Sequence, residues 1–72
     1  MDDELLTGDE VASILRATPR FVRRLVAERR IEYVKVGRLV RFEPRAVADY
    51  IERNRITPLS RAQIRRSMRE AA

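Results

Sequence analysis

The sequence predicts a small, mainly α-helical domain that carries one short β-hairpin. Apolar residues recur at helical spacing in three segments before residue 55, and between the second and third of these the apolar period shortens to two. The length of 72 residues allows a single small core and leaves little room for a second folded domain or a large catalytic cleft.

A first helix is predicted to begin directly after Thr7 and to end near Arg16. Thr7 can cap the first turn with its hydroxyl, and Glu10, three residues later, can accept a hydrogen bond from the Thr7 amide. Leu6, just before the cap, can pack onto Val11 and so fix the direction in which the chain enters the helix.

A second helix follows after a tight turn. Thr18 can cap it, and Pro19 stands in its first turn, where the missing N–H costs nothing. Val22, Leu25 and Val26 form an apolar stripe that we expect to be buried. The opposite face and its flank present basic side chains, namely Arg20, Arg23 and Arg24.

A β-hairpin is expected next, because apolar and polar residues alternate on both sides of Gly37-Arg38. Gly37 can take the positive φ that a two-residue loop needs at its first central position, and Arg38 then stands at an exposed tip with Lys35 and Arg41 close by. The alternation assigns the apolar face to four residues: Val34, Val36, Val40 and Phe42. That face must pack on the helices, because two strands alone are barely stable in water.

A third helix is predicted to begin at Glu43-Pro44 and to fade near Asn54. On it, Val47, Tyr50 and Ile51 give the apolar stripe that completes the core. Residues 1–55 would thus form the folded domain.

Residues 56–72 are predicted to form a separate basic helix that begins with a second capping box at Ser60 to Gln63 and runs to about Arg69. Its apolar line is too narrow for a helix that faces its own core. We therefore expect a self-association segment that docks on a neighbouring copy through Leu59, Ile64 and Met68. The alternative, a frayed basic tail that only adds attraction to phosphates, stays open.

The charge distribution separates an acidic beginning from a strongly basic remainder. The first 15 residues carry five acids and no base, whereas the other 57 carry 16 bases and six acids, a net charge of +10. Such a chain attracts a polyanion, either nucleic acid or an anionic membrane surface. Fifteen of the 16 bases are arginines, whose planar fork can hold a phosphate or a guanine edge with two hydrogen bonds. Codon bias can explain their number but not their positions.

The composition argues against most catalytic and metal chemistry. The chain has no cysteine and no histidine, so it lacks thiolate ligands, the usual zinc ligands and the usual general base. We expect no enzyme activity, no cofactor and no metal site. Apolar runs are only two or three residues long and no leader opens the chain, which predicts a cytoplasmic protein without membrane contact.

A helix, a short turn, a second helix with outward arginines and a hairpin with a basic tip together describe a winged helix-turn-helix, in which the hairpin is the wing. The major groove of B-DNA admits one α-helix, and the minor groove admits an arginine carried on a hairpin. The competing interpretation is a small helical domain of another function whose arginines are merely solvated.

Four spaced segments follow one another along the chain: Leu5-Leu6-Thr7-x-x-Glu10-Val11-Ala12-x-x-Leu15, Pro19-Arg20-x-Val22-Arg23-Arg24-Leu25-Val26, Ile31-x-x-Val34-Lys35-Val36-Gly37-Arg38 and Arg41-Phe42-x-Pro44-x-x-Val47-x-x-Tyr50-Ile51. In this order they resemble the excisionase-family helix-turn-helix domain, which is related to the MerR-type winged helices. The resemblance covers about residues 5–53.

The resemblance implies a DNA-binding accessory factor. Stand-alone chains of this size in the family include phage and plasmid excisionases, which bind repeated sites on double-stranded DNA, bend it and direct a partner integrase toward excision in the bacterial host cytoplasm. Neighbouring copies on the DNA and the integrase are therefore implied partners. The implied DNA-binding residues lie on the second helix, the turn before it and the wing: Arg16, Thr18, Arg20, Arg23, Arg24, Lys35, Arg38 and Arg41.

One position departs from the family pattern. The family usually has a glycine after the leucine that ends the first helix, and this chain has Arg16. If the turn needs a positive φ there, arginine costs about 1 kcal/mol relative to glycine, which a phosphate contact could offset.

Two other functions compete with excision. A small MerR-like transcriptional regulator would use the same fold, although the chain lacks the long coiled coil of typical MerR proteins. A basic RNA-binding protein would be expected to show stacking aromatics on an open surface. The chain has four aromatic residues, of which Phe21 and Tyr33 are expected at the core.

Overall fold

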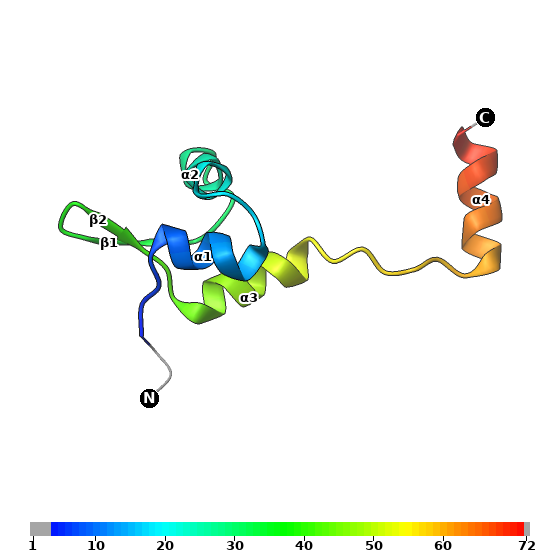
Figure 1. Ribbon diagram of the computed structural model, residues 1–72. Helices are drawn as coiled ribbons and strands as arrows, with labels where there is room; N and C mark the ends of the chain where they lie inside the picture. The colour runs from blue at the N-terminus through cyan, green and yellow to red at the C-terminus, as the bar shows by residue number, and fades with distance from the viewer. Residues whose placement is uncertain (1–3, 72) are drawn as a thin grey trace.

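The computed structural model describes residues 4–71 and confirms the predicted fold class, a mainly helical domain with one antiparallel hairpin, as in a winged helix-turn-helix (Figure 1). The elements in chain order are α1 (Gly8–Leu15), α2 (Pro19–Ala27), β1 (Val34–Val36), β2 (Leu39–Arg41), α3 (Pro44–Arg53) and α4 (Arg61–Ala71). The first three helices and the hairpin surround one small core.

The helix starts follow the predicted caps. The Thr7 hydroxyl oxygen accepts from the Glu10 amide over 3.1 Å, and the Glu10 carboxylate accepts from the Thr7 amide over 2.8 Å. Thr18 caps α2 by accepting from the Phe21 amide over 3.1 Å, and Pro19 is the first helical residue. These local bonds set the direction of both helices before any tertiary contact forms.

Both helices of the pair end in a Schellman motif with an arginine where glycine is usual. Arg16 follows α1 with φ 56°, and Arg29 follows α2 with φ 55°. Two backbone bonds, each 2.8 Å long, close these ends: Ala17 N–H to the Ala12 carbonyl and Arg30 N–H to the Leu25 carbonyl. The positive φ considered for Arg16 is therefore present, and Arg29 adds a second such position that the sequence analysis did not identify.

The core gathers one face from each of α1, α2 and α3. Its largest fully buried side chains are Val11, Val22, Leu25 and Phe42. On α3, Ala46 and Val47 are buried, and Tyr50 packs against the core cluster at its edge. The prediction that Ile51 lies in the core is wrong, because 39% of this residue is exposed. The buried stripe is centred on Ala46, Val47 and Tyr50, and Ile51 lies about a quarter turn away from it.

The hairpin packs on the helices with the predicted residues Val40 and Phe42 of its second half, but with the opposite face of β1 from the one predicted. The two-residue loop pairs Val36 with Leu39 and Val34 with Arg41, and paired residues project from the same face of a sheet. Val34 and Val36 therefore lie on the outer face. The core side of the hairpin is formed by Tyr33, Val40 and Phe42. The expected positive φ at Gly37 is confirmed at 63°.

The N-terminal segment pairs with the hairpin, which the sequence analysis did not foresee. The Leu6 amide donates to the Phe42 carbonyl over 2.7 Å, and the Phe42 amide donates to the Leu6 carbonyl over 2.9 Å. Leu6 also packs against the core cluster that contains Val11, in agreement with the predicted staple. The bridge fixes the base of the hairpin to the start of α1.

The last helix, α4, stands away from the domain at the end of an extended segment (Figure 1). Its predicted capping box forms, with Ser60 and Gln63 bonded reciprocally over 2.8 and 3.2 Å. Leu59, Ile64 and Met68 are exposed. The radius of gyration is 16.5 Å. A compact chain of this length has a radius of gyration of about 11 Å, so the position of α4 extends the molecule.

Among residues 4–71, no helix has the length and apolar character needed to cross a bilayer.

Candidate nucleic-acid interface

The outer face of α2 presents three exposed arginines, Arg20, Arg23 and Arg24. Their direction follows from the opposite face, where Val22 and Leu25 are buried in the core. Because the Thr18 cap and Pro19 fix the first turn, these arginines stand on a rigid element. A helix of this kind, with basic residues along its solvent side, fits the major groove of B-DNA.

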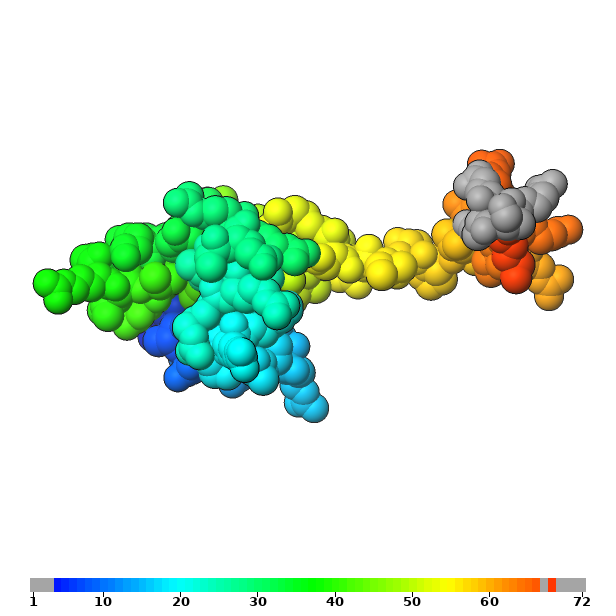
Figure 2. Space-filling view, turned by 90° about the horizontal axis from the view of Figure 1, so that it is seen from above, coloured from blue at the N-terminus to red at the C-terminus, as the bar shows by residue number. Residues whose placement is uncertain are grey.

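The wing stands beside α2, and both are visible on the face seen from above in Figure 2. A mainly apolar hollow of about 310 Å³ separates them, bounded by α2, by β2 and by the first turn of α1. Arg23 lines it from α2 and Val40 from β2. The fold thus brings the two predicted DNA-contacting elements to one side, as expected from the sequence.

The tip of the wing is thin and basic. Gly37 and Arg38 form the loop, and Arg38 and Lys35 are exposed. Arg41 is half-buried, and its guanidinium donates to the Val40 carbonyl over 2.8 Å. Arg38 and Lys35 are therefore free to meet a ligand, whereas Arg41 is partly held against the strand.

Two further predicted contacts lie in the turn between α1 and α2. Arg16 is exposed and occupies the left-handed region, so its side chain leaves the turn outward. The Thr18 oxygen is used in capping α2, but its hydroxyl hydrogen can still be donated to a phosphate. The turn can therefore offer contacts to phosphates beside α2.

None of the seven predicted DNA-binding cations forms an ion pair within the described part of the chain. The ion pairs that do form are exposed and use other arginines: Arg30 with Glu28 at 3.5 Å, Arg45 with Glu43 at 3.8 Å and Arg55 with Glu52 at 2.9 Å. Among residues 4–71, the positive charge on α2, the turn and the wing is thus not neutralised by ion pairs with carboxylates. This arrangement favours a polyanionic ligand on that side.

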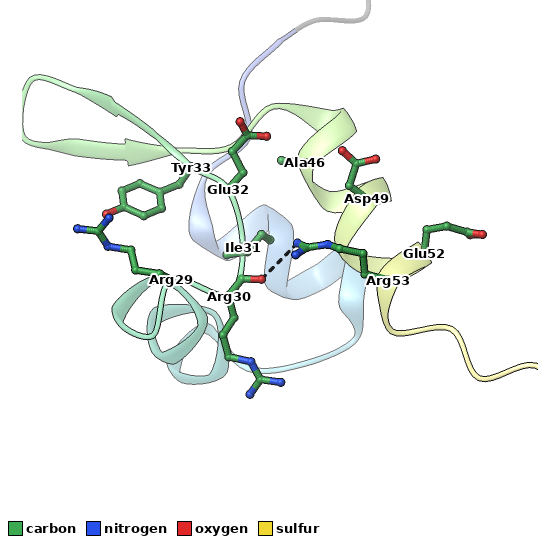
Figure 3. Close-up of a pocket in the computed structure, with 9 residues that line it drawn as sticks. All are labelled: Arg29, Arg30, Ile31, Glu32, Tyr33, Ala46, Asp49, Glu52 and Arg53. Carbon is green, nitrogen blue, oxygen red and sulfur yellow. Dashed lines mark hydrogen bonds between the residues drawn. The ribbon is translucent and has the colours of Figure 1, made fainter.

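An open groove of about 840 Å³ between the α2–β1 connection and α3 has a different character (Figure 3). Its charged lining mixes both signs: Glu32, Asp49, Glu52, Arg29, Arg30 and Arg53. The Arg53 guanidinium donates to the Arg30 carbonyl over 3.4 Å and so ties α3 to the connection. None of the predicted DNA-binding residues lines this groove, and its mixed charges give it little attraction for a polyanion.

Residues 5–55 match the family model of a helix-turn-helix domain, which is 51 of the 72 residues. The chain belongs to this helix-turn-helix family. The matched range contains α1, α2, the wing and α3 and leaves α4 outside. Helix-turn-helix domains bind DNA, and the family therefore agrees with the basic face formed by α2 and the wing. No curated protein and no solved structure matched the chain significantly.

Two exposed aliphatic side chains beside the wing loop were not expected from the sequence. Val36 and Leu39, on the two sides of the wing loop, are exposed by 46% and 51%. The sequence contains the signal for this exposure, because a two-residue loop after Val36 places Leu39 directly opposite it. The alternation of apolar residues was considered in each strand separately, without the register that pairs Val36 with Leu39.

Proposed function

We propose that this protein is a sequence-specific, DNA-bending accessory protein of site-specific recombination, an excisionase, which acts in the bacterial cytoplasm without catalysis or cofactor. The observation that carries the proposal is the uncompensated positive charge on α2 and the wing, two elements on one side of a helix-turn-helix domain. The resemblance to excisionases in residues 5–53 supports the recombination role over plain DNA occupancy.

In this function α2 enters the major groove, where Arg20 and Arg24 read guanine edges with two hydrogen bonds each. Arg23, Arg16 and Thr18 hold phosphates beside the helix, and they set its position along the groove. The wing places Arg38, with Lys35 and Arg41 behind it, at the adjacent minor groove. A protein of 72 residues contributes DNA geometry and contacts to a partner integrase, which carries out the chemistry.

Cooperative binding of several copies belongs to the same proposal. The exposed Leu59, Ile64 and Met68 on and before α4 lie away from the domain core, so they are available to a neighbouring copy on an adjacent DNA repeat. Arg61, Arg65 and Arg66 on this helix are exposed as well and can face the DNA or the acidic first segment of that neighbour.

Excision in the host tests the proposal directly. The coding sequence is deleted from a strain whose integrated element encodes this chain beside an integrase, and the excised circle junction is quantified by amplification. We expect the junction to disappear and to return with a wild-type copy but not with Arg24→Ala. Undiminished excision, together with altered transcription of neighbouring genes, would favour the MerR-like regulator instead.

A further inference from the structure

The tip of the wing exposes two aliphatic side chains that do not belong to the core cluster of the described residues. Val36 and Leu39 face each other across the loop and are about half exposed. The core side of the wing is formed by Tyr33, Val40 and Phe42 instead. Their cross-strand contact can stabilise the ribbon slightly, but it leaves about half of each residue exposed to solvent. The pair is thus an apolar surface at the projecting tip that a ligand can cover.

The surroundings of this pair indicate the kind of ligand it meets. Residues 33–42 contain three bases, Lys35, Arg38 and Arg41, and no acid. Arg38 adjoins Leu39 in the loop, and Arg41 lies on the same face of the ribbon as the pair. Lys35 adjoins Val36 but projects from the opposite face. An apolar pair flanked by these cations suits an anionic surface better than a neutral protein surface. It matches the DNA minor groove, whose walls carry phosphates and whose interior presents sugars and stacked base edges.

The shape of the wing limits what can enter that groove. The hairpin projects beyond the body of the domain (Figures 1 and 2), and apart from Gly37 itself and its two chain neighbours no heavy atom lies within 4 Å of the position where a Gly37 Cβ would stand. The minor groove is only about 6 Å wide, so a whole two-stranded ribbon does not fit and only the tip can be inserted. Val36 and Leu39 are the side chains that directly adjoin the tip.

We propose that Val36 and Leu39 form an apolar wedge that inserts from the minor groove at a base step, partly unstacks it and so produces the DNA bend. Aliphatic wedges of this kind kink the duplex by about 20 to 90° toward the major groove. Arg38 and Lys35 would hold the phosphates on the two sides of the opened step. The inference rests on the proposed DNA-binding function and adds to it the residues that cause the deformation.

The test compares affinity with bending on one probe, a duplex selected by the wild-type protein from a random pool, with 2-aminopurine placed at successive steps. The variants are Val36→Ala with Leu39→Ala combined, and Leu39→Met as the conservative change. Ile14→Ala on α1 is the matched control, because Ile14 is 50% exposed and lies outside the wing. Circular dichroism melting confirms that each variant is folded.

We expect the double variant to lose at least half of the bend angle and the 2-aminopurine fluorescence increase, while its affinity falls less than about tenfold. Leu39→Met and Ile14→Ala should bend the probe like wild type. Normal bending by the double variant would overturn the wedge and leave the proposed function intact. If the double variant bends DNA normally but no longer binds the integrase or a second copy, Val36 and Leu39 form a protein contact. That result would also overturn the wedge and leave the proposed function intact. A wild-type protein that selects no duplex, or leaves it straight, would overturn the proposed function itself.

Discussion

At the scale of single residues, two arginines with a left-handed backbone conformation allow the effect of backbone strain on stability to be measured separately from the effect of a side chain on DNA binding. Arg16 and Arg29 occupy the same Schellman position after α1 and α2, with φ values one degree apart. An L-residue with a side chain is strained there, and glycine is not. Only Arg16 is predicted to contact DNA, so the two positions form a natural pair for comparison.

Replacing either arginine by glycine should raise the free energy of unfolding by about 1 kcal/mol, because the backbone strain is relieved. In a domain of this size that corresponds to a rise of about 4 to 8 °C in Tm. Arg16→Gly should also weaken DNA binding, whereas Arg29→Gly should leave it unchanged. Thermal melting and a binding titration on the same preparations check this. Equal affinities for the two variants would remove Arg16 from the interface.

At the scale of elements, α2 and the wing should make separable contributions. Arg20→Ala or Arg24→Ala should cost about 1 to 3 kcal/mol of binding free energy and relax the preference at one or two base pairs, because in the proposed function each removes a bidentate contact to a base edge. Arg38→Ala should weaken binding with less change in major-groove preference. Affinity measured on single-base variants of a selected site gives both quantities.

Arg45→Ala is the control for these changes, since Arg45 is exposed on α3 and already paired with Glu43. Its affinity should equal that of wild type. If neither α2 substitution alters binding while the domain remains folded, the DNA-binding face has been assigned to the wrong surface.

The C-terminal helix gives a second prediction at this scale. Removing residues 58–72 should mainly abolish cooperativity between adjacent repeats, because Leu59, Ile64 and Met68 are exposed outside the core and are proposed to dock on a neighbouring copy. The measurement is the affinity of the full and the shortened chain for single and for repeated DNA sites. Loss of a basic tail would lower the affinity for both kinds of site alike, whereas loss of a docking helix would mainly lower the affinity for repeated sites. Cooperativity that survives the deletion would contradict the docking role.

The elements also show where the sequence is informative. The caps at Thr7, Thr18 and Ser60 were predictable because each depends on residues within one helical turn. On the inner face of the wing, Val40 and Phe42 were predicted correctly, whereas the face of β1 was not, because it depends on how the two strands align. The β-bridge between Leu6 and Phe42 joins residues 36 positions apart, so no local sequence pattern predicts it.

At the scale of the whole molecule, the positions of the basic residues along the elements could be predicted from the sequence, but the ion pairs that neutralise some of them could not. The sequence located the arginines on α2 and the wing. It did not reveal that the ion pairs of the described chain involve other arginines, because pairing depends on side-chain positions in space. This uncompensated charge on one face is the basis of the central claim, that the protein binds duplex DNA through α2 and the wing.

The most direct test is the salt dependence of binding to a selected duplex. Displacement of condensed counterions gives a slope of log affinity against log salt of about −0.9 for each phosphate contacted. With seven predicted cations, some of which read bases, we expect a slope of about −4 to −6. Arg38→Ala should make it shallower by about 1 and Arg45→Ala should not change it. A flat dependence, or tighter binding to structured RNA than to any duplex DNA, would contradict the account.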